Sequence, residues 1–382
     1  MQPRRTGPVS IPSSALRRLR DDRLAAVADK ITNGERLGAR EAQACLETHD
    51  LAGLGSLALA VRSALYGTRA FYVANLHLNY TNVCGNRCAF CAFHRDAGAP
   101  DAYTLTPEEA ARTVRESPVP GLCEVHVVGG CHPELPFEYY TALLRALKAQ
   151  RPGLGLKAFT AVEVQHMADR AGLTVAQCLR ELKAAGLSAM PGGGAEIFSL
   201  RLHRDLFPSK IDGDRWLSIH GEAHALGIRS NATMLFGHRE TVQERARHLL
   251  RLRDQQDRTG GFQAFIALPF HPENTPMAHL PGPSGVEILK TIATARLVLD
   301  NVPHIKAYWV MLGLKLTQVA LSFGADDLEG TIVRERIAHQ AGARTAPGLS
   351  LEELAHLVRE AGFEPVRRDT YHREVAEAEE AA

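Results

Sequence analysis

The chain has 382 residues, of which 45% are hydrophobic and 23% are charged. This composition is that of a globular protein and excludes a disordered chain. The net charge is +1, with 44 Lys and Arg against 43 Asp and Glu, so the overall charge does not favour nucleic acid or an anionic lipid surface as a partner. No apolar run approaches the roughly 18 residues that a membrane span requires. We therefore expect neither nucleic-acid nor membrane binding.

The N-terminal part of the chain is polar at first and then helical in character. Residues 1–15 contain Pro3, Pro8 and Pro12 among small polar residues, so we expect a disordered tail. No apolar signal segment follows Met1, which favours a cytoplasmic location. The following segment, residues 16–72, is expected to form a helical N-terminal extension.

Residues 73–340 alternate short apolar runs with amphipathic segments. Thr106 and Glu109 form a capping box around Pro107, which predicts that a helix begins there. Repeated strand–helix units with near-continuously apolar strands are typical of a parallel sheet covered by helices. Eight units predict a (β/α)8 TIM-type barrel of the α/β class, and a partial six-stranded barrel is the alternative because the eighth strand is weak. The predicted strands are Leu76–Thr81, Glu124–Val128, Leu156–Thr160, Leu187–Met190, Arg229–Met234, Gln263–Leu268, Ile305–Val310 and Ala320–Ala325.

Residues 341–382 are expected to form a short C-terminal α/β extension. Ser350 and Glu353 form another capping box, which predicts a helix through about Ala361. The acidic, alanine-rich tail from Glu374 is expected to fray.

The most informative motif follows the first predicted strand and contains three cysteines. Cys84, Cys88 and Cys91 have the spacing C-x3-C-x2-C, and no fourth cysteine follows nearby. Thiolates hold Fe–S clusters, and a cubane cluster held only by protein uses four cysteines. Three thiolates leave one iron open to another ligand, so the motif predicts a [4Fe–4S] cluster with an open iron.

Two other uses of these cysteines are weighed against the cluster. Zinc takes four N or S ligands, so the three cysteines and His94 form an alternative zinc site, although zinc cysteines are usually spaced C-x2-C. A structural disulfide fits less well, because a cytosolic chain uses cysteines more often for metals or catalysis. The other four cysteines lack ligand spacing and are expected to be buried apolar fillers. They are Cys45, Cys123, Cys178 and Cys131, and Cys131 is the one that deserves a test.

Glycines and carboxylates follow the next predicted strands. The active site of such a barrel lies at the C-terminal ends of its strands. Gly129 and Gly130 follow the second strand, where paired glycines let the backbone approach a ligand closely. Glu163 follows the third strand, and Glu196 lies in a glycine-rich loop after the fourth. Both carboxylates suit ribose hydroxyls or an amine, and a solvated or salt-bridged glutamate is the alternative.

Two histidines are further candidates. His126 belongs to an otherwise apolar strand, so it either faces the barrel interior or is a satisfied core histidine. His271 lies in the loop Pro269–Thr275 after the sixth strand. A polar, proline-rich loop at a strand exit is a candidate for substrate binding.

The cysteine motif resembles that of the radical S-adenosylmethionine (SAM) enzymes, and Phe90 fits their aromatic position before the last cysteine. The resemblance implies that SAM chelates the open iron and is cleaved to a 5′-deoxyadenosyl radical. It also implies that Gly129 and Gly130 hold the amino group of SAM's methionine. The glutamate that usually follows this glycine pair is replaced by Cys131.

Longer stretches, within roughly residues 30–370, resemble the aminofutalosine synthase family. They are His77–Cys84, Lys157–Ala161, Gly192–Phe198, Asn231–His238, Phe270–Thr275 and Gly324–Thr331. Leu76 is a departure, because arginine is frequent there in the family. Cyclic dehypoxanthinyl futalosine synthase and the deazaflavin (FO) synthase subunits are the alternatives.

The resemblance implies a reaction of menaquinone biosynthesis. The adenosyl radical would add to 3-[(1-carboxyvinyl)oxy]benzoate, and rearrangement with decarboxylation would give 6-amino-6-deoxyfutalosine. An electron donor such as flavodoxin or ferredoxin is also implied. Implied catalytic residues are His126, Glu196 and His271. Implied cofactor-binding residues are Phe90, Gly129, Gly130, Glu163, Glu196 and Asn231. Candidate partners for the carboxylates of this aromatic dicarboxylate are Arg204, Lys210, Arg229, His271 and Lys306.

Overall fold

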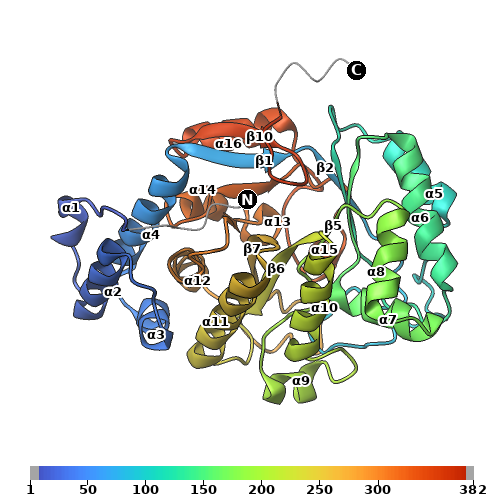
Figure 1. Ribbon diagram of the computed structural model, residues 1–382, viewed down its shortest axis with the longest axis horizontal. Helices are drawn as coiled ribbons and strands as arrows, with labels where there is room; N and C mark the ends of the chain where they lie inside the picture. The colour runs from blue at the N-terminus through green and yellow to red at the C-terminus, as the bar shows by residue number, and fades with distance from the viewer. Residues whose placement is uncertain (1–7, 376–382) are drawn as a thin grey trace.

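A computed structural model describes residues 8–375 of the chain as a curled parallel sheet surrounded by helices (Figure 1). The strands are β1 Arg69–Val73, β2 Asn75–Leu78, β3 Glu124–Val127, β4 Gly155–Ala158, β5 Ala189–Met190, β6 Arg229–Phe236, β7 Phe262–Pro269, β8 His304–Lys306, β9 Asp327–Gly330 and β10 Glu364–Arg368. Their order in the sheet is β10-β1-β9-β8-β7-β6-β5-β4-β3-β2, and every pair is parallel.

The eight strands β2 to β9 form the wall of a barrel in chain order. A parallel bridge between Leu76 and Val333 joins β2 to the segment after β9, and the His77 N–H donates to the Val333 carbonyl at 3.0 Å. This bridge brings the two edges of the eight-stranded wall together. The predicted barrel class is thereby confirmed, with β1 and β10 added beyond β9.

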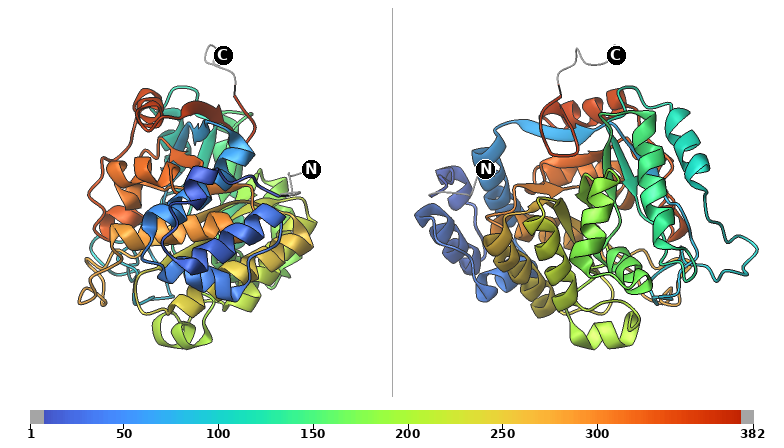
Figure 2. Two further views of the ribbon diagram at one scale, coloured as in Figure 1. Left: turned by 90° about the vertical axis from the view of Figure 1, so that its left-hand side faces the viewer. Right: turned by 45° about the vertical axis from the view of Figure 1, so that its right-hand side comes forward.

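The helices cover the outside of the wall, and the N-terminal helices form an additional layer at one side (Figure 2). They are α1 Ser13–Leu16, α2 Asp22–Asn33, α3 Ala39–Glu47, α4 Leu51–Tyr66, α5 Pro107–Arg115, α6 Phe137–Gln150, α7 Ala161–Ala171, α8 Val175–Ala184, α9 Leu200–Leu206, α10 Gly213–Ala225, α11 Val242–Thr259, α12 Gly285–Val298, α13 Trp309–Leu312, α14 Leu314–Leu321, α15 Ile337–Gln340 and α16 Leu351–Glu360. The helices α3 and α4 pack on α11 and α12. None of the helices in residues 8–375 has the length and apolarity needed to cross a bilayer.

Two helix starts agree with the capping boxes that were predicted from the sequence. The Thr106 hydroxyl accepts from the Glu109 N–H at 3.2 Å, which forms the predicted capping box of α5. Ser350 and Glu353 form the same box at α16. Both predictions needed only residues within one helical turn.

The eighth predicted strand was wrong. Residues 314–321 form α14, which covers the first part of the predicted strand, and the strand itself is β9, a few residues later. Its sequence, Asp-Leu-Glu-Gly, carries two charges that are buried in the sheet. These charges can be buried because they are paired with lysine and arginine side chains from other strands. Since the segment itself is half charged, it lacks the apolar run by which strands are recognised. The seventh strand is also shorter than predicted, because α13 begins at Trp309.

The predicted extensions need three corrections. Residues 8–15 are ordered rather than disordered, since Val9 and Ile11 are buried and Val9 N–H donates to the Ile31 carbonyl at 3.2 Å; residues 1–7 lie outside the described part. The N-terminal extension is helical to Tyr66, but it then supplies β1. At the other end Glu374 bridges to Arg368, while residues 376–382 lie outside the described part.

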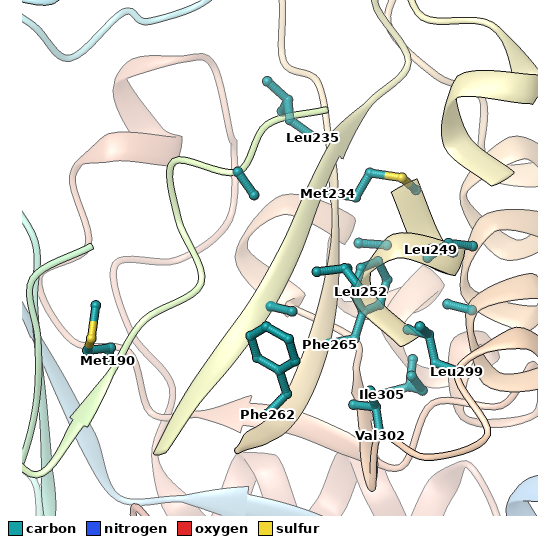
Figure 3. Packing of buried hydrophobic residues seen from close by; sticks show 14 of the residues in the cluster. Met190, Met234, Leu235, Leu249, Leu252, Phe262, Phe265, Leu299, Val302 and Ile305 are labelled. Atoms are coloured by element: carbon teal, nitrogen blue, oxygen red, sulfur yellow. The ribbon is translucent and has the colours of Figure 1, made fainter. Parts of the chain in front are cut away.

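The main apolar core lies between the sheet and its outer helices. Figure 3 shows Phe265 and Ile305 of neighbouring strands beside Leu249 and Leu252 of α11. Full burial of such side chains contributes about 1.5–3 kcal/mol each. The core therefore leaves the inner face of the barrel free to carry polar side chains.

The interior of the barrel has polar layers set by strand register. Asn75 pairs with Glu124 across β2 and β3, and His77 pairs with His126 two residues later. Lys157 of β4 continues this second layer, because it pairs with His126. In-register residues of neighbouring parallel strands share one face of the sheet. The two histidines and Lys157 thus lie side by side within the barrel.

Candidate active site

A cavity of about 320 Å³ opens at the C-terminal ends of the strands. Every predicted catalytic, cofactor-binding or cluster-binding residue lines this cavity, although these residues come from six separate segments. They are Cys84, Cys88, Cys91, Phe90, His126, Gly129, Gly130, Glu163, Glu196, Asn231 and His271. The structure thus brings the predicted residues together, and their individual roles stay predictions.

The cysteine loop is held by backbone hydrogen bonds. The Gly85 N–H donates to the Cys131 carbonyl at 3.1 Å, and the Cys131 N–H donates to Cys84 Sγ at 3.4 Å. A hydrogen bond from the Cys131 side chain helps to lower the pKa of Cys84 to about 5, against the effect of burial. A thiolate is the form that binds metal. Cys131, one of the expected fillers, therefore lies directly against Cys84, a predicted cluster ligand.

The donor set of this loop fits an Fe–S cluster better than zinc. Cys84, Cys88 and Cys91 line one cavity, yet within residues 8–375 no group of three or more His, Cys, Asp or Glu side chains converges on a single-ion site. His94, the fourth ligand of the zinc alternative, directs Nδ1 to the Cys91 carbonyl at 3.0 Å. A cluster with an open iron needs the three thiols only.

Lys210 and Glu196 form an ion pair beside the cysteine loop. Lys210 Nζ lies 2.5 Å from Glu196 Oε1 and 5.2 Å from the centre of the Phe90 ring. Burial alone would lower the pKa of Lys210, but its coulombic interactions with Cys88 and Glu196 and the hydrogen bond to Glu196 raise it overall. Burial raises the pKa of the Cys88 thiol itself to about 12. The lysine is therefore charged and compensates the carboxylate of Glu196 beside the cysteine loop.

The backbone of Glu196 is in an unusual conformation. Its φ angle is 46°, in the left-handed region that residues with a side chain seldom adopt. The Glu196 carbonyl accepts from the Leu235 N–H at 2.8 Å, which fixes the loop to β6. Such strain is found where the surroundings impose it, often at functional sites.

Glu163 has more protein partners than the sequence suggests. Its carboxylate accepts from the Tyr80 hydroxyl at 2.8 Å, from the Gly129 N–H at 3.0 Å and from the Thr160 N–H at 2.7 Å. Burial raises the pKa of Glu163 to about 7, although these hydrogen bonds act in the opposite direction. The carboxylate therefore ties the glycine turn to the start of α7, and any contact with SAM would add to that role.

The two glycines after β3 are required by close packing. A Cβ on Gly130 would lie 2.2 Å from the Val83 carbonyl oxygen and 2.8 Å from Cys84 Cβ. A Cβ on Gly129 would lie 2.7 Å from the Tyr80 ring. The glycine turn therefore supports the cysteine loop directly, whatever it contributes to binding SAM.

The deeper part of the cavity contains residues that the sequence did not single out. The rings of His77 and His126 stack with centres 4.5 Å apart, and Tyr308 lies 6.3 Å beyond His77. Asn79 and Glu335 line the same region. The register of β2 and β3 is the signal that would have found His77, because it places His77 beside the predicted His126.

Only two of the candidate carboxylate partners reach the cavity, namely Lys210 and His271. Arg204 is exposed and bonded to the Leu200 carbonyl, and Arg229 lies at the start of β6, the end of the strand away from the site. Lys306 is buried in an ion pair with Glu329 at 2.6 Å. Those three residues are therefore not cavity residues.

Comparison with known families agrees with this geometry. The radical SAM superfamily matches residues 78–252, and the CofH/MqnC C-terminal region matches residues 259–379. The chain is 44% identical to the aminodeoxyfutalosine synthase of Thermus thermophilus, over 94% of this chain and 98% of that protein. It is 42% identical to the enzyme of that name from Streptomyces coelicolor, over 92% of this chain and 93% of that protein.

Two further similarities are broader. The chain is 43% identical to the 5-amino-6-(D-ribitylamino)uracil–L-tyrosine 4-hydroxyphenyl transferase of Methanopyrus kandleri, over 82% of this chain and 86% of that protein. The crystal structure of methylornithine synthase superposes with a TM-score of 0.70 at 19% identity, covering 89% of this chain and 97% of that one. The latter supports the fold alone. The chain belongs to the radical SAM superfamily, whose members use a [4Fe–4S] cluster and SAM, and within it to the family of the aminodeoxyfutalosine synthases.

Proposed function

We propose that this enzyme joins the adenosyl group of SAM to 3-[(1-carboxyvinyl)oxy]benzoate and forms 6-amino-6-deoxyfutalosine, with loss of the carboxylate of the carboxyvinyl group as CO2 or bicarbonate. The observation that carries the proposal is the near full-length similarity to aminodeoxyfutalosine synthases, together with one cavity that unites the predicted catalytic, cofactor-binding and cluster-binding residues. SAM is then a substrate that is consumed with each product molecule.

A [4Fe–4S] cluster bound here would supply the electron that cleaves SAM. In this proposal Cys84, Cys88 and Cys91 hold the cluster, and the turn Gly129–Gly130 together with Asn231 positions SAM beside it. Glu196 and Lys210 are already an ion pair at the cavity wall, where they can orient the ribose or the amine of SAM. The protein thus contributes binding, orientation and the exclusion of water.

The substrate side of the cavity is assigned to the deeper walls. Ile266, Leu268 and Met311 line it with apolar surface, which suits a benzoate ring. His126 and His271 are proposed to contact the substrate, and His271 is already fixed by its Nε2 at 3.0 Å from the Met311 carbonyl. A flavodoxin or ferredoxin as electron donor and a cytoplasmic location belong to the same proposal.

The test is to follow the adenosyl carbons of SAM. The reconstituted enzyme, a strong reductant and SAM labelled in the adenosyl moiety are supplied with 3-[(1-carboxyvinyl)oxy]benzoate. We expect the label in 6-amino-6-deoxyfutalosine, in equal amount to the SAM consumed. Label found only in 5′-deoxyadenosine would contradict the proposal.

A second candidate is supported by the similarity to the tyrosine 4-hydroxyphenyl transferase. An enzyme of that kind would act on tyrosine and 5-amino-6-(D-ribitylamino)uracil. The same assay with these two compounds distinguishes the candidates, because the label would then stay in 5′-deoxyadenosine while tyrosine is consumed.

A further inference from the structure

The floor of the cavity is formed by two histidines, His126, which is proposed to contact the substrate, and His77, which has no assigned task. His77 and His126 come from neighbouring strands, lie in register and stack with an interplanar angle of 13°. Both line the cavity. They lie below the cysteine loop, because the chain runs from His77 through β2 to Cys84 at the mouth.

Neither ring has a hydrogen bond to the described residues. His77 Nε2 and His126 Nδ1 are buried without a partner, and the His77 side chain belongs to a residue that is only 6% exposed. A buried polar atom without a hydrogen bond costs about 1–3 kcal/mol. Two such rings on one cavity floor indicate a ligand that supplies the missing partner.

The surroundings of the pair indicate the charge of that ligand. The charged groups that face it are Glu124, Lys157, Lys306, Glu329 and Glu335. Both lysines are already neutralised, since Lys157 lies 2.7 Å from Glu124 and Lys306 lies 2.6 Å from Glu329. Glu335 is paired with His339 at 2.9 Å. The imidazoles themselves are therefore the groups that can become cationic on this floor.

We propose that His77 and His126 form a carboxylate-binding site, which anchors one carboxylate of the aromatic substrate at the floor of the cavity. This inference rests on the proposed function for the identity of the substrate, and it deepens that function by naming the residues that recognise it. Tyr308, whose ring is parallel to that of His77 at 6.3 Å, would flank the bound group.

We expect that binding of the carboxylate is coupled to the uptake of a proton. Burial lowers the pKa of His77 to about 3 and that of His126 to about 4, so both rings are neutral near pH 7 in the empty cavity. A carboxylate beside them favours the charged imidazole. Binding should therefore take up about one proton from the buffer, a readout that a purely structural histidine pair would not give.

The experiment is calorimetry on the cluster-loaded protein with SAM and without reductant, so that nothing turns over. 3-[(1-carboxyvinyl)oxy]benzoate is titrated at pH 7 in two buffers of different ionisation enthalpy, and the number of protons taken up is obtained from the difference. We expect uptake of about one proton in the wild type. In His77→Asn and His126→Asn the uptake should disappear and the dissociation constant should rise about tenfold or more, which corresponds to about 1.4 kcal/mol.

Matched probes assign the carboxylate and keep the proposal independent of the reaction. The two monomethyl esters of the substrate show which carboxylate is anchored, since only one of them should lose proton uptake. Isophthalate tests the site without any enol ether, so histidine-dependent binding of isophthalate would support the site even where the label-transfer assay fails. Iron content and circular dichroism confirm that the variants are folded, and His77→Gln and His126→Gln replace any variant that is not.

One result would overturn the inference. If the wild type binds the diacid without proton uptake, and the folded variants bind it with unchanged affinity, the histidines are not the anchor. Formation of 6-amino-6-deoxyfutalosine by the same preparation would then leave the proposed function standing while the carboxylate site fell.

Discussion

The mouth and the floor of the barrel are built in opposite ways. At the mouth the loop Cys84–Cys91 is held by backbone hydrogen bonds and by glycine contacts. Its nearby ion pair, Arg87 with Asp96, is largely exposed, with side chains 68% and 65% accessible. At the floor, strands in register place charged side chains in pairs such as Lys157 with Glu124, where both are fully buried.

This difference separates two kinds of recognition. Backbone amides and carbonyls offer the same groups whatever the side chains are, so a mouth built from them suits a cofactor that a whole superfamily shares. Buried side chains are specific to one sequence, and in a region of low dielectric each charge needs its partner. We therefore expect changes at the mouth to abolish cofactor chemistry, and changes at the floor to affect stability and substrate recognition.

The largest effect is expected from loss of a cluster ligand. Cys88→Ala removes one of only three thiolates, so the brown chromophore and all SAM cleavage should disappear. Iron content, the absorption spectrum and 5′-deoxyadenosine formation measure the result. Cys178→Ala is the control, because Cys178 is buried in α8 and does not line the cavity. Full iron content and turnover in Cys88→Ala would sink the assignment of the cluster.

The next effect tests the buried ion pairs beneath the floor as a stability element. Lys306→Met leaves Glu329 and Asp327 with less compensation in a buried network, and breaking such a pair costs about 3–5 kcal/mol. Arg87→Met removes a surface pair at the mouth, which is expected to cost at most about 1 kcal/mol. Urea unfolding of both variants measures the comparison. Equal losses of stability would show that the floor and the mouth do not differ as described.

The predictability of the molecule follows the same division. The cofactors, inferred from the cysteine spacing, and the two capping boxes were predicted correctly, because each signal is contained in a few consecutive residues. The segment Asp327–Gly330 was missed because its charges are stabilised by Lys306 and Arg368, which belong to other strands. No local pattern contains that information.

The sequence predicted many of the residues that line the cavity, but it did not predict the contacts that these residues make. Strand exits placed the predicted catalytic, cofactor-binding and cluster-binding residues at one cavity, but three of the five candidate carboxylate partners lie outside it. The sequence could not show that the Glu163 carboxylate accepts hydrogen bonds from Tyr80 and Gly129. These hydrogen bonds depend on how three strands approach one another. His77 was missed for a related reason, because its role is visible only beside His126.

A smaller effect is expected from filling the glycine turn at the mouth. Gly130→Ala would place a Cβ 2.2 Å from the Val83 carbonyl oxygen, so the cysteine segment must shift. We expect reduced iron content and about a tenfold loss of SAM affinity, which is about 1.4 kcal/mol. Gly85→Ala is the matched control within the loop, because its Cβ would find only the Cys131 carbonyl oxygen at 3.9 Å. If Gly130→Ala loads iron and binds SAM like the wild type, close packing is not what requires this glycine.

The last effect concerns Glu163, the carboxyl group that links the glycine turn at the mouth to the start of α7. Burial raises the pKa of Glu163 to about 7, above the value of about 4.3 expected in the unfolded chain. The folded state therefore binds the proton more tightly, so stability contributed by the protonated form is lost as pH rises from about 4.5 to about 7. Glu163→Gln cannot titrate, and it keeps a side chain of the same size.

The stability of the wild type relative to Glu163→Gln should therefore fall across this pH range. The hydrogen bonds from Tyr80, Gly129 and Thr160 stabilise the ionised form, and the pKa of about 7 already includes their effect. A shift from about 4.3 to about 7 corresponds to a fall of roughly 2–4 kcal/mol. Urea unfolding of both proteins at pH 5, 6, 7 and 8 measures this fall. The difference between the two free energies of unfolding removes the contribution of the histidines, which both proteins contain. A difference that stays constant over this range would mean that Glu163 is ionised throughout, and that the mouth, like the floor, relies on a buried charge.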